Sequence, residues 1–475
     1  MMNRVFFVSL IVVLISSLDA GGLLCQYYPD HRPGPPIKAG LARDLDGPLS
    51  FFECNAAGPV YRWFAGKIND EGGIYLADYR EDVDIELIVR DFDVLTWDLP
   101  AVTQALIHTD YVDLVWGSPG TDCIVTQAPI CNANQVLLVT LEGGANQMAW
   151  DDHQLRDLPY VWVSSSFSNW YQIPVLYDVL NAELDHDPVA YITYVGEYGV
   201  MYGLEYKTEM IREFGLANVI DAGNHSSQLT SGQADEIIAN AKIALGNATD
   251  PNYDIFCAFA YPQNVNKLVQ ACIDNNFNPP AILFGLGANF ASFGAPPPEG
   301  SGAANVEGIM CFAVANKDTV PLVGTPKMSM AEMYDAIADQ VENDLPCGSQ
   351  NLTSGGQALD YWGTPCYVAG LEMWRYAVEV AGNLDYDDVR KALAEFGPSN
   401  PAQTVFGETW YTVFGNGYGG GILAYECHTG EIGQWQSGVV EIIGYDGITD
   451  DLPNYCVTAN LTYPMTDSWG WLSYE

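Results

Sequence analysis

The chain has 475 residues, of which 48% are hydrophobic and 16% charged, and this composition excludes a disordered protein and allows two or three domains with sizeable cores. Its formal net charge of −42 comes from a shortage of basic residues, with 18 Lys and Arg against 60 Asp and Glu. A surface of this kind repels phosphate groups, which argues against nucleic acid and anionic membranes as partners.

The first 20 residues have the pattern of a secretory signal peptide. Arg4 precedes an apolar run over residues 5–18, and small and polar residues follow it. A proline-rich leader occupies residues 21–36. Because no later apolar run reaches the roughly 20 residues that a membrane helix needs, we expect no transmembrane helix in the mature chain. The predicted location is secreted, either extracellular or periplasmic.

Strand patterns alternate with helix patterns from residue 37 onward. Short apolar runs at 37–41, 85–89 and 112–116 are separated by helical spacing at 60–69 and 99–108. This order predicts right-handed crossovers and a parallel sheet covered on both faces. Ligands bind beyond the carboxyl ends of such strands, which here means residues 45–50 and 117–121.

Further strands and helices follow, and a second set of units starts at residue 189. Strands are predicted at 136–140, 160–164, 189–195, near 219, at 253–259 and at 281–284, with helices at 169–184, 203–214, 234–245 and 265–275. A strand over 306–314 is interpreted as the return to the first lobe, and helices are expected at 329–342, 365–381 and 385–396.

The first third of the chain carries an ordered set of sequence runs. AGKINDEGGI at 65–74 is followed by IELIVRD at 85–91, ALIHTDYVD at 105–113 and GSP at 117–119. In order and spacing this set resembles the type I periplasmic solute-binding proteins, which serve ABC importers of branched-chain amino acids, amides and urea. The resemblance implies an α/β fold of two Rossmann-like lobes with parallel sheets, a hinge between them and a ligand cleft.

Domain boundaries follow from this comparison. The first lobe is expected at residues 37–158 and again at 306–400, and the second lobe at 159–305. Residues 401–475 are expected to form the hinge return and a C-terminal extension, since the resemblance fades beyond Trp435. The partners implied are a small polar ligand and a membrane permease, with no cofactor and no catalytic activity.

Candidate ligand contacts lie in the loops that would line this cleft, and they are hydroxyls, aromatic rings and one acid. Tyr198 is the strongest candidate, because GEYG at 196–199 matches the place where the family has a cleft tyrosine followed by glycine. The first lobe contributes Ser50, Ser118, Thr121, Thr140 and Glu142, and the second contributes Tyr198, Tyr202 and Tyr261.

Two positions depart from the amino acid binders of the family. Where those proteins hold the ligand ammonium with an acid, this chain has Gly285, Leu286 and Gly287, and Glu142 stands where small residues usually bind a carboxylate. A zwitterionic α-amino acid is therefore less favoured than an amide, urea-like, polyol or cationic ligand. The alternative is a secreted scaffold or receptor-like ectodomain that keeps the fold without importer function.

Motifs for other chemistry are weak. GNGYGG at 415–420 satisfies GxGxxG, but it lies between strand patterns and opens no helix, so it predicts a hairpin turn. The six histidines form neither HExxH nor an i, i+4 pair, and no GxSxG run is present. We therefore predict neither a catalytic residue nor a metal site.

Eleven cysteines in a secreted chain predict that most are oxidised. We expect bridges from Cys123 to Cys131 and from Cys347 to Cys366, because each pair brackets a predicted loop. Four sequons are candidates for N-glycosylation, at Asn224, Asn247, Asn351 and Asn460.

Overall fold

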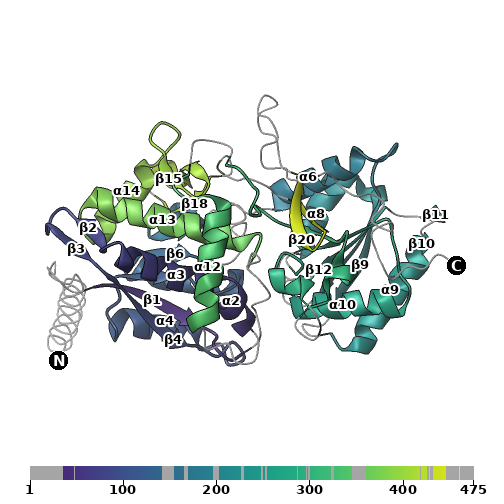
Figure 1. Cartoon of the computed structure of the whole chain (residues 1–475), viewed down its shortest axis with the longest axis horizontal. Helices are drawn as coiled ribbons and strands as arrows, with labels where there is room; N and C mark the ends of the chain where they lie inside the picture. Colours follow the sequence, from purple (N-terminus) through teal and green to yellow (C-terminus); the bar gives the residue numbers. More distant parts are fainter. Residues whose placement is uncertain are drawn as a thin grey trace, which may run out of the picture.

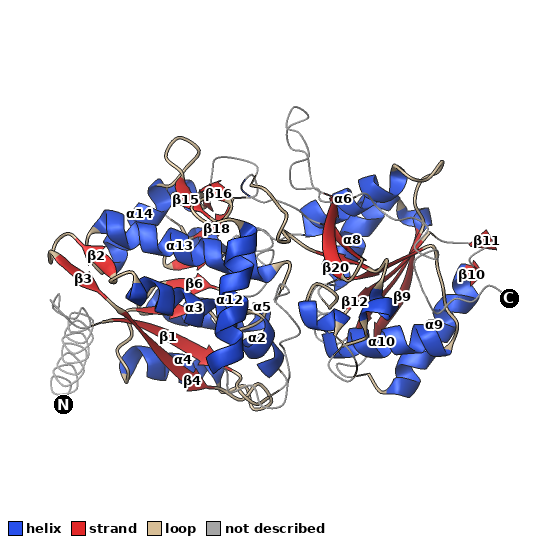
Figure 2. Ribbon diagram, in the orientation of Figure 1, coloured by secondary structure: helices blue, strands red, loops and turns tan. Residues whose placement is uncertain are grey.

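Short apolar strands alternate with helices to build two seven-stranded sheets, one in each of two lobes that lie side by side in the computed structural model (Figure 1). Figure 2 shows helices along the sheet of each lobe. The predicted signal peptide and nearly all of the leader lie outside the described part of the chain. The structure describes residues 36–47, 49–141, 154–164, 169–195, 203–225, 229–247, 250–251, 254–260, 262–285, 287–295, 297, 300–321, 326–344, 360–417, 419–424, 427, 432–444 and 459.

The first-lobe sheet has the strand order β17-β18-β7-β6-β5-β1-β4, and its strands from β18 to β4 run parallel. Its register places Ile37 beside Ile85 and Ala39 beside Leu114. The strands are β1 (Ile37–Arg43), β4 (Ile85–Asp91), β5 (Leu114–Trp116), β6 (Leu138–Thr140), β7 (Val161–Val163), β17 (Tyr411–Val413) and β18 (Gly421–Leu423).

The helices of this lobe come from both ends of the chain. Helix α13 contacts α3 and β6, and α4 contacts β1 and α5. They are α2 (Ser50–Asn55), α3 (Ala57–Asp70), α4 (Leu99–His108), α5 (Thr121–Ala133), α12 (Met330–Asp344), α13 (Gly363–Ala381) and α14 (Tyr386–Glu395). Two hairpins, β2 (Ile74–Leu76) with β3 (Glu81–Val83) and β15 (Ala402–Thr404) with β16 (Gly407–Thr409), complete it, with 3₁₀ turns η2 (Gln154–Asp157) and η5 (Gly415–Gly417).

The second-lobe sheet has the order β20-β19-β14-β13-β12-β8-β9, parallel from β14 to β9 and antiparallel at β19 and β20. Its strands are β8 (Ala190–Val195), β9 (Val219–His225), β12 (Ile255–Phe259), β13 (Ala281–Phe284), β14 (Met310–Phe312), β19 (Ile432–Gln436) and β20 (Val439–Gly444). Its other elements are α6 (Asn169–Asn181), α8 (Gly203–Phe214), α9 (Ser231–Leu245), α10 (Pro262–Asp274), α11 (Ala303–Val306), η3 (Leu216–Asn218), η4 (Ala291–Gly294) and the pair β10 (Gly246–Asn247) with β11 (Asp250–Pro251).

The predicted α/β fold of two parallel sheets is confirmed, and α4, α8 and β13 have the predicted bounds. The strand predicted over 306–314 differs in its partners. It forms β14, which pairs with β13 in the second lobe instead of returning to the first. β7 likewise pairs with β6, so the first lobe continues past residue 159. An apolar run shows that a strand exists, but only hydrogen bonds identify its neighbour.

The described part of the chain crosses between the lobes three times. It leaves the first lobe after β7, returns after β14 to α12, and leaves again after β18 to β19. The sequence predicts a hinge return and an extension over residues 401–475. In the structure β15 to β18 belong to the first lobe, and β19 and β20 belong to the second. The predicted turn at 415–420 is confirmed, since antiparallel β17 and β18 flank it.

The predicted disulfide between Cys123 and Cys131 is wrong. Both are buried thiols on α5, and burial raises the pKa of Cys131 to about 12. Eight residues along a helix span about 12 Å. A disulfide requires Cα atoms about 4.4–6.8 Å apart, so a bridge between them is impossible. The sequence predicts a loop between these cysteines, but the segment is helical despite Pro129.

The other two predictions about the cysteines are also wrong. Cys366 is a buried thiol, so its predicted bridge to Cys347, which lies outside the described residues, is wrong. Cys54 is disulfide-bonded. Seven of the described cysteines are thiols, which also contradicts the prediction that most cysteines are oxidised.

Among the glycosylation candidates, Asn224 is exposed on β9 and Asn247 lies on β10. Asn351 and Asn460 fall outside the described residues. Glycosylation of all four remains a prediction. Within the described residues, no helix combines the length and the apolarity that crossing a bilayer demands.

Candidate functional site

A buried ionic network closes the carboxyl end of β1. Arg43, the last residue of the strand, has a fully buried side chain whose Nε donates to Glu53 Oε2 over 2.7 Å. Its Nη1 donates to the carbonyl oxygen of Gly117, over 3.3 Å, at the end of the neighbouring strand β5. Arg62 Nη2 lies 2.6 Å from Glu53 Oε1, and the Tyr61 hydroxyl donates to the same oxygen. The network therefore joins α2, α3 and two strand ends.

The electrostatics of this network favour a charged Glu53. Burial by itself raises the pKa of Glu53, but Arg43, the Tyr61 hydroxyl and Arg62 together bring that pKa below its ordinary value. The two guanidinium groups also face the Tyr61 ring, at 5.7 Å for Arg43 and 5.0 Å for Arg62. Burial raises the pKa of Tyr61 well above its ordinary value, which keeps its hydroxyl a donor.

The loop after β1 is shaped by its own acid. Asp44 is buried, and its carboxylate accepts from Gly47 N over 2.8 Å and from Leu49 N over 2.7 Å. Ser50, a predicted ligand contact, donates from Oγ to the carbonyl of Gly47 over 2.7 Å. These hydrogen bonds fold the loop back on itself and fix the start of α2, which contacts the second lobe through Phe51.

Two more predicted contacts, Ser118 and Thr140, lie at the ends of β5 and β6, and both are buried. Ser118 Oγ donates to Ala42 O over 2.5 Å, and its N–H donates to Gln127 Oε1 over 2.9 Å. Thr140 Oγ1 accepts from Ser164 N over 3.2 Å. The side-chain oxygens in this conformation therefore serve the backbone of the protein, and their role in ligand binding remains a prediction.

Thr121 opens α5 and is buried beside Gly120, whose φ of 85° places it in the left-handed region that suits glycine. The four first-lobe candidates in the described chain thus gather at the carboxyl edge of one sheet, as predicted. Glu142, Tyr198, Tyr202 and Tyr261 lie outside the described residues.

Helix α13 packs closely on this edge at Gly370. A Cβ there would lie 2.2 Å from the Ser164 Cβ and 3.2 Å from its Cα, so alanine is expected to destabilise the protein by about 1–3 kcal/mol, although alanine favours a helix by about 0.5–1 kcal/mol. Gly66 in α3 is the matched control, because nothing lies within 4 Å of its Cβ position. Gly66→Ala should stabilise the protein. Urea unfolding measures both, and equal effects would contradict the close packing.

Aromatic rings join the two lobes directly. Phe290, which follows β13 of the second lobe, lies 4.8 Å from the ring of Phe51 and 6.0 Å from that of Phe52, edge to face in both cases. Phe51 and Phe52 belong to α2, next to Ser50. Loops that leave the carboxyl ends of the two sheets therefore meet each other.

The carboxyl edge of the second-lobe sheet is aromatic. Tyr206 of α8 stacks on Phe259 at 4.3 Å and on Phe312 at 5.4 Å, and these two are the last residues of β12 and β14. The Tyr206 hydroxyl donates to Gln172 Oε1 over 2.8 Å. Gln172 Nε2 and the hydroxyl of Tyr194 on β8 are buried and make no hydrogen bond. Two buried hydrogen-bond donors, the Gln172 amide and the Tyr194 hydroxyl, therefore lie near the stacked aromatic rings.

Three aspartates at the carboxyl edge of the first-lobe sheet are close enough together to hold a cation. Oxygens of Asp44, Asp46 and Asp91 lie within 4.8 Å of one another. Hard cations take carboxylate oxygens of this kind, but exposed acidic groups are common without an ion. Asp44 is occupied by two backbone N–H groups, and burial raises its pKa. The group is compatible with a cation, and nothing further assigns one.

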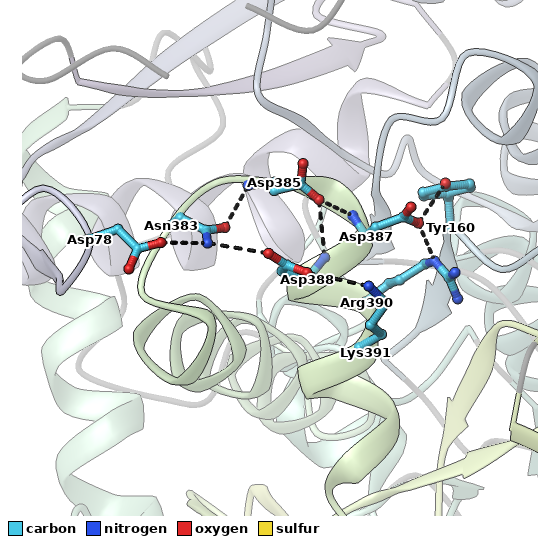
Figure 3. Close-up of polar contacts among 8 residues, drawn as sticks. All are labelled: Asp78, Tyr160, Asn383, Asp385, Asp387, Asp388, Arg390 and Lys391. Carbon is cyan, nitrogen blue, oxygen red and sulfur yellow. Dashed lines mark hydrogen bonds and ion pairs between the residues drawn. The ribbon is translucent and has the colours of Figure 1, made fainter. Parts of the chain in front are cut away.

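A second polar cluster lies at the opposite edge of the first lobe (Figure 3). Asp385 caps α14 by accepting from Asp387 N over 2.9 Å and Asp388 N over 3.2 Å. Tyr160, just before the amino end of β7, donates to Asp387 over 2.9 Å. Asn383 joins Asp78 of the β2–β3 turn to Asp388. These contacts stabilise helix ends, away from the carboxyl edges.

Sequence reasoning missed Arg43, Glu53 and Phe290. Arg43 had a usable signal, since it is one of only 18 basic residues and lies two residues after a predicted apolar strand. Phe290 had none, because its partner is more than 200 residues away in sequence.

No protein-family model and no curated protein matches this chain. Several solved structures do. The isoleucine complex of the branched-chain amino acid transporter substrate-binding protein LivJ from Streptococcus pneumoniae is 15% identical, with a TM-score of 0.60 over 86% of this chain and 99% of that one. The leucine-binding protein LivK from Thermotoga maritima is 15% identical, with a TM-score of 0.59 over 88% and 100%. A solute-binding protein of an ABC transporter from Rhodopseudomonas palustris with 3,4-dihydroxybenzoic acid is 12% identical, with a TM-score of 0.61 over 86% and 96%. These likenesses show the fold.

Proposed function

We propose that this chain, whose fold is that of the type I periplasmic solute-binding proteins, captures a small polar ligand between its lobes and delivers it to the permease of an ABC importer. The observation that carries the proposal is the contact of Phe51 and Phe52 with Phe290, because it brings together loops from the carboxyl ends of two parallel sheets. Ligands bind at such ends. Binding occurs by lobe closure and requires no chemistry.

The second-lobe edge supports a proposal for the ligand class. A Cβ at Gly285 would lie 3.0 Å from the Phe259 ring, and one at Gly287 would lie 2.1 Å from Val265 Cγ2. An acid that holds an ammonium group has little room at either position. An amide or urea-like ligand, which needs hydrogen bonds without a counter-charge, is therefore favoured over an α-amino acid.

A thermal-shift screen tests the function. It covers amino acids, amides, ureas, polyamines, sugars and aromatic acids, the last because one similar structure holds a dihydroxybenzoic acid. A ligand at 100 times its Kd stabilises the folded state by about 2.7 kcal/mol, which is easily detected. A screen without any stabilising compound would favour the alternative of a secreted scaffold or receptor-like ectodomain.

Tyr198→Ala tests the proposed site once a ligand is found. Affinity should fall about tenfold or more, while the unliganded stability stays within about 1 kcal/mol, because a ring lining an open cleft contacts the ligand more than the core. Tyr111→Ala is the control, since Tyr111 is exposed at the amino end of β5 and should leave affinity unchanged. Unchanged affinity together with a collapsed Tm for Tyr198→Ala would make this tyrosine a packing residue.

A further inference from the structure

A buried carboxylate lies where the two lobes join. Asp360 precedes α13 of the first lobe by three residues and is fully buried. The backbone beside it is bonded to the second lobe, since Tyr361 N donates to Asn289 O over 2.9 Å and Val314 N donates to Tyr361 O over 2.9 Å. One short segment therefore holds second-lobe loops and starts a first-lobe helix.

The Asp360 side chain also spans the junction. Asn289 Nδ2 donates to Oδ1 over 2.6 Å, and Trp362 N donates to the same oxygen over 2.9 Å. Asp360 Oδ2 makes no hydrogen bond of normal geometry, and neither does Asn289 Oδ1. Both atoms are acceptors inside the protein. The Gly363 N–H acts on the Asp360 carboxylate, but neither acceptor atom has a well-aligned donor, and an unmet buried acceptor costs stability.

The groups around Asp360 do not neutralise its charge. Cys311 of β14 and Tyr334 of α12 interact with it, and Tyr367 Oη and Asp360 Oδ2 both lie within 2.4 Å of the Cβ position at Gly363. Tyr361 is next to Asp360 in the chain, and burial and the Glu441 carboxylate of β20 raise its pKa. Burial and Cys366 likewise raise the pKa of Tyr334. Among the described residues, no cation contributes to the ionisation of Asp360. The N–H groups of Gly363 and Trp362 and the Asn289 amide lower the pKa of Asp360. Burial has the larger effect and raises this pKa to about 6.

We propose that Asp360 and Asn289 form a proton-binding joint between the lobes, in which a proton on Asp360 Oδ2 supplies the missing donor and holds the lobes in this arrangement. The proton comes from solvent and returns to it. When it leaves, a buried negative charge remains without a cation, and separation of Asn289 from Asp360 lets water reach the carboxylate. Lobe movement is therefore linked to proton release.

The sign follows from the direction of the pKa shift. Because the pKa of Asp360 rises from 3.8 to about 6 on folding, the native state binds this proton more tightly than the unfolded state. The resulting stabilisation is fully present below pH 3.8 and is lost as the pH rises through about 6. The lobes are therefore held more tightly in acid than at neutral pH.

Small-angle scattering of the unliganded full chain between pH 4.5 and 8 tests the joint. The wild-type radius of gyration should change in one transition centred near pH 6, because that is where Asp360 ionises. Asp360→Asn should give a flat curve, since its amide stays neutral and supplies its own donor. Glu372→Gln is the matched control: burial raises the pKa of Glu372 to about 7, but its carboxylate accepts from Val405 N inside the first lobe. This control should keep the transition.

A second variant guards against misfolding of the first. Asn289→Asp places two carboxyl groups around one proton, which should move the transition upward by about one pH unit or more. The proposal is overturned by a wild-type radius that does not change with pH. It is equally overturned if Asp360→Asn follows the wild-type curve, or if Glu372→Gln flattens the curve as strongly. These measurements use no ligand, so they are independent of the proposed importer function.

Discussion

Glu53→Gln is expected to lower the free energy of unfolding by about 3–5 kcal/mol, because it leaves the buried guanidinium of Arg43 without a counter-charge. Arg43 has no exposed side-chain surface, so water cannot replace the lost carboxylate. Urea unfolding at pH 7 measures the change. The effect also depends on pH. Burial raises the pKa of Glu53, but Arg43, Tyr61 and Arg62 together bring it below 4.5 in the folded protein. The stabilisation by Glu53 is therefore present above pH 4.5 and is lost as the pH falls through the pKa of the folded state.

Two further variants separate charge from packing. Lys391→Gln breaks an exposed pair with Asp388, at 3.3 Å, and should change stability by less than about 1 kcal/mol. The double variant Arg43→Met with Glu53→Gln removes the stranded charge and should recover part of the loss. If Glu53→Gln alone costs no more than Lys391→Gln, the network at the end of β1 does not hold the site in place.

Trp116→Ala is expected to cost about 3–5 kcal/mol, the usual price of deleting a large buried aromatic ring and leaving a cavity. Trp116 is fully buried at the end of β5. Its ring lies 6.2 Å from that of Phe64 on α3 and 5.7 Å from that of Trp374 on α13, edge to face in both. Phe64 comes before the excursion of the chain through the second lobe, and Trp374 comes after it. The side chain therefore joins the two halves of the first lobe.

Chemical denaturation monitored by circular dichroism tests this assignment. Leu95→Ala is the control, because Leu95 is 80% exposed and its loss should change stability by no more than about 0.5 kcal/mol. Trp116→Phe keeps part of the packing and should fall between the two. A loss below 1 kcal/mol for Trp116→Ala would mean that α13 does not complete the first-lobe core.

The sequence by itself determined many of the elements and the edge at which function is sought. The bounds of α4, α8 and β13 followed from apolar spacing, because a helix or a buried strand repeats its pattern locally. The βαβ order predicted parallel sheets, and it placed Ser50, Ser118, Thr121 and Thr140 at one carboxyl edge.

Only the tertiary structure decided which segments meet. The apolar run at 306–314 predicts a returning strand, but hydrogen bonds place β14 beside β13. Cys123 and Cys131 flank a predicted loop, but they lie in one helix. The contact of Phe51 with Phe290 and the hydrogen bond from Asn289 to Asp360 join residues far apart in the chain. Such pairs depend on where distant strands end in space, and a local pattern holds no information about that distance. The physical reason is that periodicity reports which face of an element is buried, whereas the partner that buries it is set by the packing of the whole fold.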